Sequence, residues 1–212
     1  MGVKILHQVW IQGEDELPEE YQKNRQLWRD SLPKDWEMKL WDEQAARERW
    51  ADYAEVSDKC FHHATRCDLI LARAQRDIGG LSCGTDVAPL NVPDLMKWVE
   101  LNDTLVIVNA AAKSCSNGLS YFGNTNHPFL NCLCRHQLRG GGKYLGSKNV
   151  WMSTGPGAWY QAFVAHRWNL SLVTDSRVYG KVGDINPKSF VDPGCAGSWH
   201  TGFSNAISTP LD

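Results

Sequence analysis

The sequence predicts a layered α/β domain, and three observations carry this prediction. Residues 3–11 form an apolar, β-branched run of the kind found in buried strands of parallel sheets. Helix-like and strand-like segments then alternate along the chain, which is typical of an α/β fold. The 212 residues, 42% of them hydrophobic, suit one globular domain of ordinary size. We therefore expect a single domain over residues 1–212.

The strand signals are short apolar or alternating segments. We predict strands at residues 3–11, 37–41, 81–83, 105–108, 170–174 and 176–179. Residues 117–129 are polar and glycine-bearing, so we expect a loop there, and residues 140–142 are expected to form a flexible glycine turn.

The helix signals come from amphipathic spacing and from end residues. We predict helices at residues 18–31, 42–53, 68–78, 94–100, 129–138 and 159–167, with a linker at residues 57–63. Pro18 suits a first helical turn. The pair Gly79-Gly80 suits a helix end because glycine accepts the left-handed conformation of a C-terminal cap.

Composition narrows the class of protein. The net charge of −2 argues against a general nucleic-acid binder, which would carry a basic excess. Seven cysteines without a CxxC pair indicate reduced thiols rather than a zinc site or a disulfide framework. No signal peptide is evident, and no apolar run approaches the ~20 residues that span a bilayer. We expect a soluble, cytoplasmic protein without a membrane segment, or a domain of a longer protein.

The residues around which the chemistry is expected lie between Asp68 and Pro89. A helix, the glycine pair and a short strand lead to Gly84-Thr85-Asp86. Asp86 therefore stands where a strand ends, which is where ligands bind in α/β domains. Taken alone, an aspartate in this place is also a common turn residue. Ten tryptophans add rings that can stack on bases and sugars, although most are expected in the core.

Four ordered segments carry a resemblance to a known family. They are KILHQVWI at residues 4–11, the Asp68–Asp86 segment, Thr154-Gly155-Pro156, and Gly197-Ser198-Trp199. Together they resemble the DxD-type sugar-nucleotide glycosyltransferases of family 32, which include α-mannosyltransferases with bacterial and viral relatives. The resemblance implies a GT-A, Rossmann-like fold, with a mixed, mainly parallel sheet flanked by helices.

The resemblance also implies an activity. A hexose or deoxyhexose would pass from a nucleotide-diphosphate sugar, with UDP as the expected nucleotide, to a glycan or glycoprotein acceptor, assisted by Mn²⁺ or Mg²⁺. Asp86 would be the catalytic metal ligand, joined by His200. The donor would be bound by Gln8, Val9, Trp10, Asp68, Gly84, Thr85, Asn117, Ser198 and Trp199. Trp10 would stack on the base, the alternative being a core tryptophan at a strand end.

Two departures from the family pattern leave alternatives open. Gly84 replaces the first aspartate of DxD, so a catalytically impaired nucleotide-sugar-binding protein is a second reading. Leu71 replaces an arginine beside Asp68, which suggests a donor with fewer hydroxyl groups. A glycan-binding module that uses its tryptophans fits the four ordered segments less well. Retention and inversion both stay open, with Asp103, Asp184 and Asp192 available as general bases.

Overall fold

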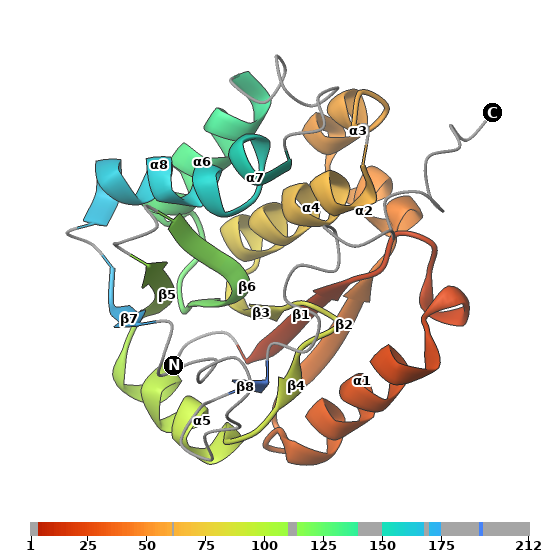
Figure 1. The fold of residues 1–212 in the computed structure, drawn as a ribbon, viewed down its shortest axis with the longest axis vertical. Coiled ribbons are helices and arrows are strands. Elements are labelled where there is room, and N and C mark those ends of the chain that lie inside the picture. Colours follow the sequence, from red (N-terminus) through yellow and green to blue (C-terminus); the bar gives the residue numbers. More distant parts are fainter. Residues whose placement is uncertain are drawn as a thin grey trace.

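A computed structural model describes residues 4–60, 62–109, 114–139, 150–167, 170–174 and 191–192. The chain forms a six-stranded mixed sheet in the order β2-β1-β3-β6-β5-β7, and β4 pairs with β8 in a separate two-stranded ribbon. The β1–β2, β1–β3 and β5–β7 pairs are parallel, whereas β6 runs antiparallel to both β3 and β5. The predicted α/β class, with a mixed sheet flanked by helices, is confirmed (Figure 1).

The strands are β1 (Ile5–Val9), β2 (Glu37–Trp41), β3 (Gly80–Cys83), β4 (Ala88–Pro89), β5 (Thr104–Asn109), β6 (Ser114–Phe122), β7 (Leu172–Thr174) and β8 (Val191–Asp192). The helices are η1 (Glu14–Glu16), α1 (Glu19–Ser31), α2 (Glu43–Arg49), α3 (Ala51–Ser57), α4 (His63–Asp77), α5 (Val92–Leu101), α6 (Pro128–Arg139), α7 (Val150–Ser153) and α8 (Pro156–His166). None of the helices in the described residues is long and apolar enough to cross a membrane.

The sheet is covered by helices on both faces. Figure 1 shows α1 and α5 on one side of the sheet, and α2, α3, α4, α6, α7 and α8 on the other. The first side buries one apolar cluster that includes Leu6, Trp28 and Leu95. The second side buries two clusters, one around Trp50 and one around Trp159. Neighbouring residues of β5, Leu105 and Val106, therefore enter different clusters, as the period of a β-strand requires.

A buried histidine ties the central strand to the end of α4. The indole N–H of Trp41 donates to Nδ1 of His7 at 3.1 Å, so Nε2–H of His7 donates to the carbonyl oxygen of Gly79 at 2.8 Å. Gly79 and Gly80 have φ angles of 82° and 97°, which confirms the predicted helix end. A Cβ atom on Gly80 would lie 2.6 Å from the carbonyl oxygen of Ile5, so this close approach also requires glycine.

The structure corrects the prediction of one continuous helix over residues 42–53. Two helices, α2 and α3, meet at Trp50, whose backbone is extended with φ −124° and ψ 102°. The Trp50 ring packs against Trp41 at 4.8 Å between centroids, and its N–H donates to Asp77 at 2.8 Å. These tertiary contacts break the helix, because the local sequence contains no glycine or proline that would signal an end.

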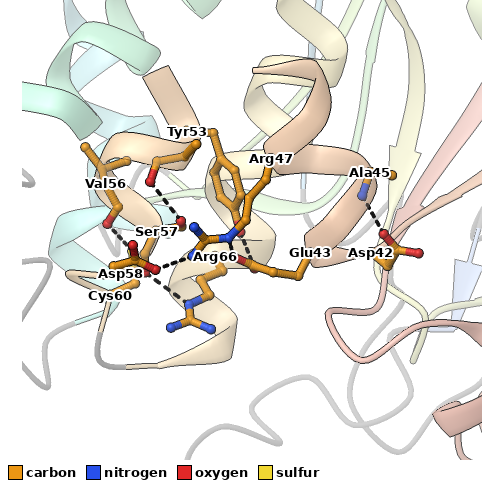
Figure 2. Close-up of polar contacts among 11 residues, drawn as sticks. Asp42, Glu43, Ala45, Arg47, Tyr53, Val56, Ser57, Asp58, Cys60 and Arg66 are labelled. Atoms are coloured by element: carbon orange, nitrogen blue, oxygen red, sulfur yellow. Dashed lines mark hydrogen bonds and ion pairs between the residues drawn. The ribbon is translucent and has the colours of Figure 1, made fainter. Parts of the chain in front are cut away.

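The same helix pair carries a polar network that closes onto α4 (Figure 2). Glu43 accepts hydrogen bonds from Arg47 at 2.6 Å and from the Tyr53 hydroxyl at 2.5 Å. Arg47 also pairs with Asp58, and Arg66 on α4 donates to the carbonyl oxygen of Ser57 at 3.2 Å (Figure 2). The network therefore stabilises the turn from α3 into α4. This turn is shorter than the linker predicted at residues 57–63, because α3 includes Ser57 and α4 begins at His63 rather than at residue 68.

The predicted loop at residues 117–129 is wrong in its first half. Residues up to Phe122 belong to β6, which pairs with β3 and β5. The polar side chains that suggested a loop are bonded inside the protein: Ser120 exchanges hydrogen bonds with Gln75 and Ser82. Strand pairing between distant segments thus overrides the local polar composition.

The remaining helices shift at their ends. Helix α5 begins two residues before the predicted start and α8 begins at Pro156 rather than residue 159. The predicted strand at residues 176–179 and the glycine turn at residues 140–142 lie outside the described residues.

Candidate functional site

Segments from several elements meet at one edge of the sheet. Strands β1 and β3 are parallel and neighbours, so their carboxyl ends lie at the same edge. Strand β6 runs antiparallel to β3, so its first residues lie beside the end of β3. The Gly84 N–H donates to the carbonyl oxygen of Gly118 at 3.1 Å and ties the loop after β3 to this place. Ligands of open α/β sheets bind at this kind of edge.

Asp68 forms a polar node between three distant segments. It lies on α4, and its Oδ1 accepts a hydrogen bond of 2.6 Å from Nδ2 of Asn117 on β6. Its Oδ2 accepts a hydrogen bond of 2.9 Å from the hydroxyl of Thr154, which follows α7. Two of the predicted donor-binding residues, Asp68 and Asn117, are therefore brought into direct contact.

Burial controls the ionisation of Asp68. Its side chain keeps some exposure, yet it is surrounded by enough protein to raise the pKa of the carboxyl to about 7. The hydrogen bonds from Thr154 and Asn117 oppose this rise because they favour the anion. Both partners are neutral, and Arg73 points elsewhere, fully buried against Asp52 at 3.1 Å. Leu71 packs in the apolar cluster on this side of the sheet and brings no charge.

The loop after β3 places Asp86 over Gly84. A Cβ atom on Gly84 would lie 2.4 Å from Oδ1 of Asp86, so the carboxyl occupies the space beside the glycine. Gly84 does not have a left-handed φ, and its conformation is therefore open to other residues. Burial raises the pKa of the Asp86 carboxyl, and the nearby charge of Glu20 adds to this rise.

The described residues do not by themselves make a metal site. Among them, no three histidine, cysteine, aspartate or glutamate side chains gather closely enough to bind an ion. Asp86 alone would supply one carboxylate, whereas Mg²⁺ and Mn²⁺ take about six ligands. Asp86 therefore fits a divalent cation only where a ligand such as a diphosphate supplies the other oxygens.

The remaining predicted residues of β1 have different surroundings. Gln8 is fully buried and Val9 nearly so, whereas Trp10 is half-buried at the carboxyl end of the strand. The Trp10 N–H donates to the carbonyl oxygen of Glu16 at 3.1 Å, and its ring meets Tyr21 edge-on at 5.7 Å. Base stacking by Trp10 and donor contacts by Gln8 and Val9 stay predictions.

Other predicted residues are buried or lie outside the description. Thr85 is buried, and its carbonyl oxygen accepts a hydrogen bond from Asn24 at 3.4 Å. Ser198, Trp199 and His200 lie outside the described residues. Two shallow cavities of about 360 and 440 Å³ lie elsewhere, beside Arg135 and beside Gln12, and neither is lined by Asp68 or Asp86.

Sequence reasoning did not select two residues that the structure places near this edge. Thr154 lies in the Thr154-Gly155-Pro156 segment, but its contact with Asp68 spans 86 positions and has no local signal. Arg25 is 4% exposed, which is unusual for an arginine, and it donates to Gln8 at 2.8 Å. Helical spacing puts Arg25 on the same face of α1 as Tyr21 and Trp28, but the charge of an arginine by itself suggests an exposed side chain.

Comparison with known proteins places the fold. No protein-family model matches the sequence, and no curated protein matches it. A solved structure with the same fold is the PaToxG glycosyltransferase, with a TM-score of 0.58 and 15% sequence identity. The similarity covers 77% of this chain and 69% of that chain. The chain therefore has the Rossmann-like α/β fold of a glycosyltransferase.

Proposed function

We propose that this protein is a glycosyltransferase that uses a nucleotide-diphosphate sugar, with UDP as the expected nucleotide. The observation that carries the proposal is the node at Asp68. Asp68 and Thr154 come from two of the four ordered segments, and Asn117 is a further residue that the resemblance implies at the donor. The three side chains meet through hydrogen bonds of 2.6 and 2.9 Å. The fold, which a glycosyltransferase shares, supports the same reading.

In this proposal Asp68 binds the donor sugar. A carboxylate that already accepts one hydrogen bond on each oxygen still has lone pairs free for sugar hydroxyl groups. Asn117 and Thr154 orient the carboxyl group, so that little freedom is lost when the sugar binds. Among the described residues, no cation contributes to the pKa of Asp68, which supports a donor with fewer hydroxyl groups, such as a deoxyhexose.

Trp10 and Asp86 take the other parts of the donor. Trp10 stacks on the base from the end of β1, and Asp86 faces the diphosphate from the end of β3. In the reaction the bond between the sugar C1 and the diphosphate oxygen breaks, and a bond from C1 to an acceptor oxygen forms. The acceptor hydroxyl gives up its proton to the leaving diphosphate or to a general base. Mn²⁺ or Mg²⁺ bound by Asp86 and the diphosphate, with His200 as a further ligand, would stabilise the negative charge of the leaving group.

A screen of donors tests the proposal. Thermal unfolding is measured with UDP-hexoses, GDP-hexoses and their deoxy forms, each with and without Mn²⁺, because a true donor stabilises the fold. The donor that raises the melting temperature is then incubated with the protein, and release of free nucleotide is followed. Asp68→Asn should lose both effects. A wild-type protein that neither binds nor cleaves any nucleotide sugar would contradict the proposal.

A second function is supported by Gly84. A single carboxylate in this loop suits a protein that binds nucleotide sugars without transferring them. In that case a donor would raise the melting temperature, but no nucleotide would be released with or without Mn²⁺. The two assays together therefore separate an enzyme from a binding protein.

A further inference from the structure

Side chains of helix α1 donate hydrogen bonds to the backbone of the loop that carries Asp86. Three carbonyl oxygens of this loop accept hydrogen bonds from side chains on the α1 side of the sheet. Gln8 donates to Gly84 at 3.3 Å, Asn24 donates to Thr85 at 3.4 Å, and Trp28 donates to Val87 at 2.8 Å. The Val87 N–H closes the turn on the carbonyl oxygen of Gly84 at 3.3 Å.

Arg25 lies behind this loop and is joined to it through Gln8. Its Nη1 donates to Oε1 of Gln8 at 2.8 Å, and its Nη2 pairs with Glu14 at 3.1 Å. The Arg25 side chain is 5% exposed, whereas that of Glu14 is 63% exposed. The Arg25 guanidinium group therefore binds Gln8 and Glu14 and is not exposed to a ligand.

The chemistry of the two side chains determines the orientation of Gln8. A guanidinium group only donates hydrogen bonds, so the amide oxygen of Gln8 must face Arg25. The amide nitrogen of Gln8 must then face the other way, toward the carbonyl oxygen of Gly84. Without Arg25 the buried amide could turn over and present its oxygen to another oxygen, which would release the loop.

We propose that Arg25 is a positioning residue that, through Gln8, fixes the Gly84–Val87 turn and with it the carboxyl group of Asp86. The role of Asp86 toward the donor diphosphate rests on the proposed function, but the effect of Arg25 on the turn does not. The chain Glu14, Arg25, Gln8, Gly84 connects the segment after Trp10 to the loop after β3. Binding of the donor near Trp10 is therefore expected to depend on how well the loop after β3 is ordered.

Hydrogen exchange of the Val87 amide tests the proposal on the free protein. Arg25→Met and Gln8→Glu should each speed exchange at Val87 by about tenfold or more, because both variants loosen the turn. Gln8→Glu keeps the oxygen that faces Arg25 and removes the N–H that faces Gly84, so it isolates the last link. Arg29→Met is the matched control, since Arg29 lies exposed on the same helix and donates to Gln26.

The amide of Leu32, bonded to Trp28 at the end of α1, reports general loosening. Exchange at Leu32 should stay unchanged in all variants. If Arg25→Met does not fold, Arg25→Lys replaces it, because an ammonium group cannot reach Gln8 and Glu14 together in the same fork geometry. Val87 exchange at the wild-type rate in the Arg25 and Gln8 variants would overturn the proposal.

Calorimetry with UDP and Mn²⁺ then measures the consequence for binding. Arg25→Met and Gln8→Glu should raise the Kd of UDP by about tenfold, and Arg29→Met should leave it unchanged. Faster Val87 exchange with an unchanged Kd would overturn the link between the turn and the donor. A wild-type protein that binds no nucleotide, yet shows the exchange effect, would refute the proposed function and leave the positioning role of Arg25 intact.

Discussion

Thr154 and Asp68 lie 86 residues apart in the sequence, yet the Thr154 hydroxyl donates to the Asp68 carboxyl at 2.9 Å. Thr154 is fully buried, and its own backbone is fixed by hydrogen bonds to Val150 and from Gln137. The hydroxyl group is thus held in place before any ligand arrives. The Thr154-Gly155-Pro156 segment therefore does more than begin helix α8, because it also orients the Asp68 carboxyl.

Removing the Thr154 hydroxyl should weaken donor use. Thr154→Val keeps the volume of the side chain and leaves one carboxylate oxygen of Asp68 without its partner. At pH 8 the Asp68 carboxyl is mostly charged. A hydrogen bond to a charged group contributes about 1.5–3 kcal/mol, so kcat/KM at this pH should fall about tenfold to a hundredfold. Thr154→Ser, which keeps the hydroxyl, should restore most of the rate. Equal rates for the valine and serine variants would show that the contact has no part in turnover.

The raised pKa of Asp68 gives a stability effect with a definite sign. Its carboxyl has a pKa of about 7 in the folded protein and about 4 in an unfolded chain, so the folded state retains the proton longer. This contribution to stability is present below pH 4 and is lost as the pH rises to 7. Asp68→Asn, which carries no charge, should therefore gain stability relative to wild type between pH 4 and pH 8, as measured by urea unfolding. If the difference in unfolding free energy between the two proteins does not change with pH, the Asp68 carboxyl is not buried enough to raise its pKa.

His7 should produce the opposite dependence on pH. Burial lowers the pKa of His7 to about 4, whereas an unfolded histidine has a pKa of 6.5. The folded protein is thus favoured above pH 6.5 and loses about 3 kcal/mol as the pH falls to 4. His7→Phe should be less stable at pH 7, because Trp41 and Gly79 lose their partner, but less sensitive to acid. Parallel pH profiles for the two proteins in urea unfolding would exclude His7 as the source.

Gly84 can be tested by restoring a second carboxylate. The nearest obstacle to a side chain there is Oδ1 of Asp86, the end of a side chain that can rotate, and the backbone of Gly84 is not left-handed. Gly84→Asp should therefore fold and bind Mn²⁺ more tightly in the presence of UDP, while Asp86→Asn should abolish that binding. Gly84→Ala controls for the added volume. Calorimetric titration of Mn²⁺ with and without UDP measures all three, and equal affinities for wild type and Asp86→Asn would remove the metal role of Asp86.

Trp10 offers a test of the base site. Trp10→Ala should weaken UDP binding by about 1–3 kcal/mol, the usual contribution of aromatic stacking on a base. Because Trp10 is only half-buried, we expect this substitution to have a small effect on the melting temperature. Trp10→Phe keeps an aromatic ring, so its affinity for UDP should lie between those of wild type and Trp10→Ala. Unchanged UDP affinity together with a lower melting temperature would identify Trp10 as a packing residue.

Local pattern was sufficient for much of the fold. Strand β2 has the predicted bounds, and the ends of α1 and α4 follow from Pro18 and from Gly79-Gly80. Apolar periodicity and turn chemistry act over a few residues, so a single sequence carries them directly. The break at Trp50 and the strand β6 could not be predicted in this way, because they depend on contacts with Asp77 and with β3.

For the candidate site as well, the sequence predicted some features and only the tertiary structure decided others. The sequence by itself predicted which residues would bind a nucleotide sugar, and it placed Asp68 on a helix and Asp86 after a strand. Only the tertiary structure decided that Thr154 and Asn117 bond to Asp68, and that Arg25 supports the loop of Asp86 through Gln8. The physical reason is that propensity acts between neighbours along the chain, whereas the orientation and ionisation of a carboxyl group depend on whatever the fold packs around it.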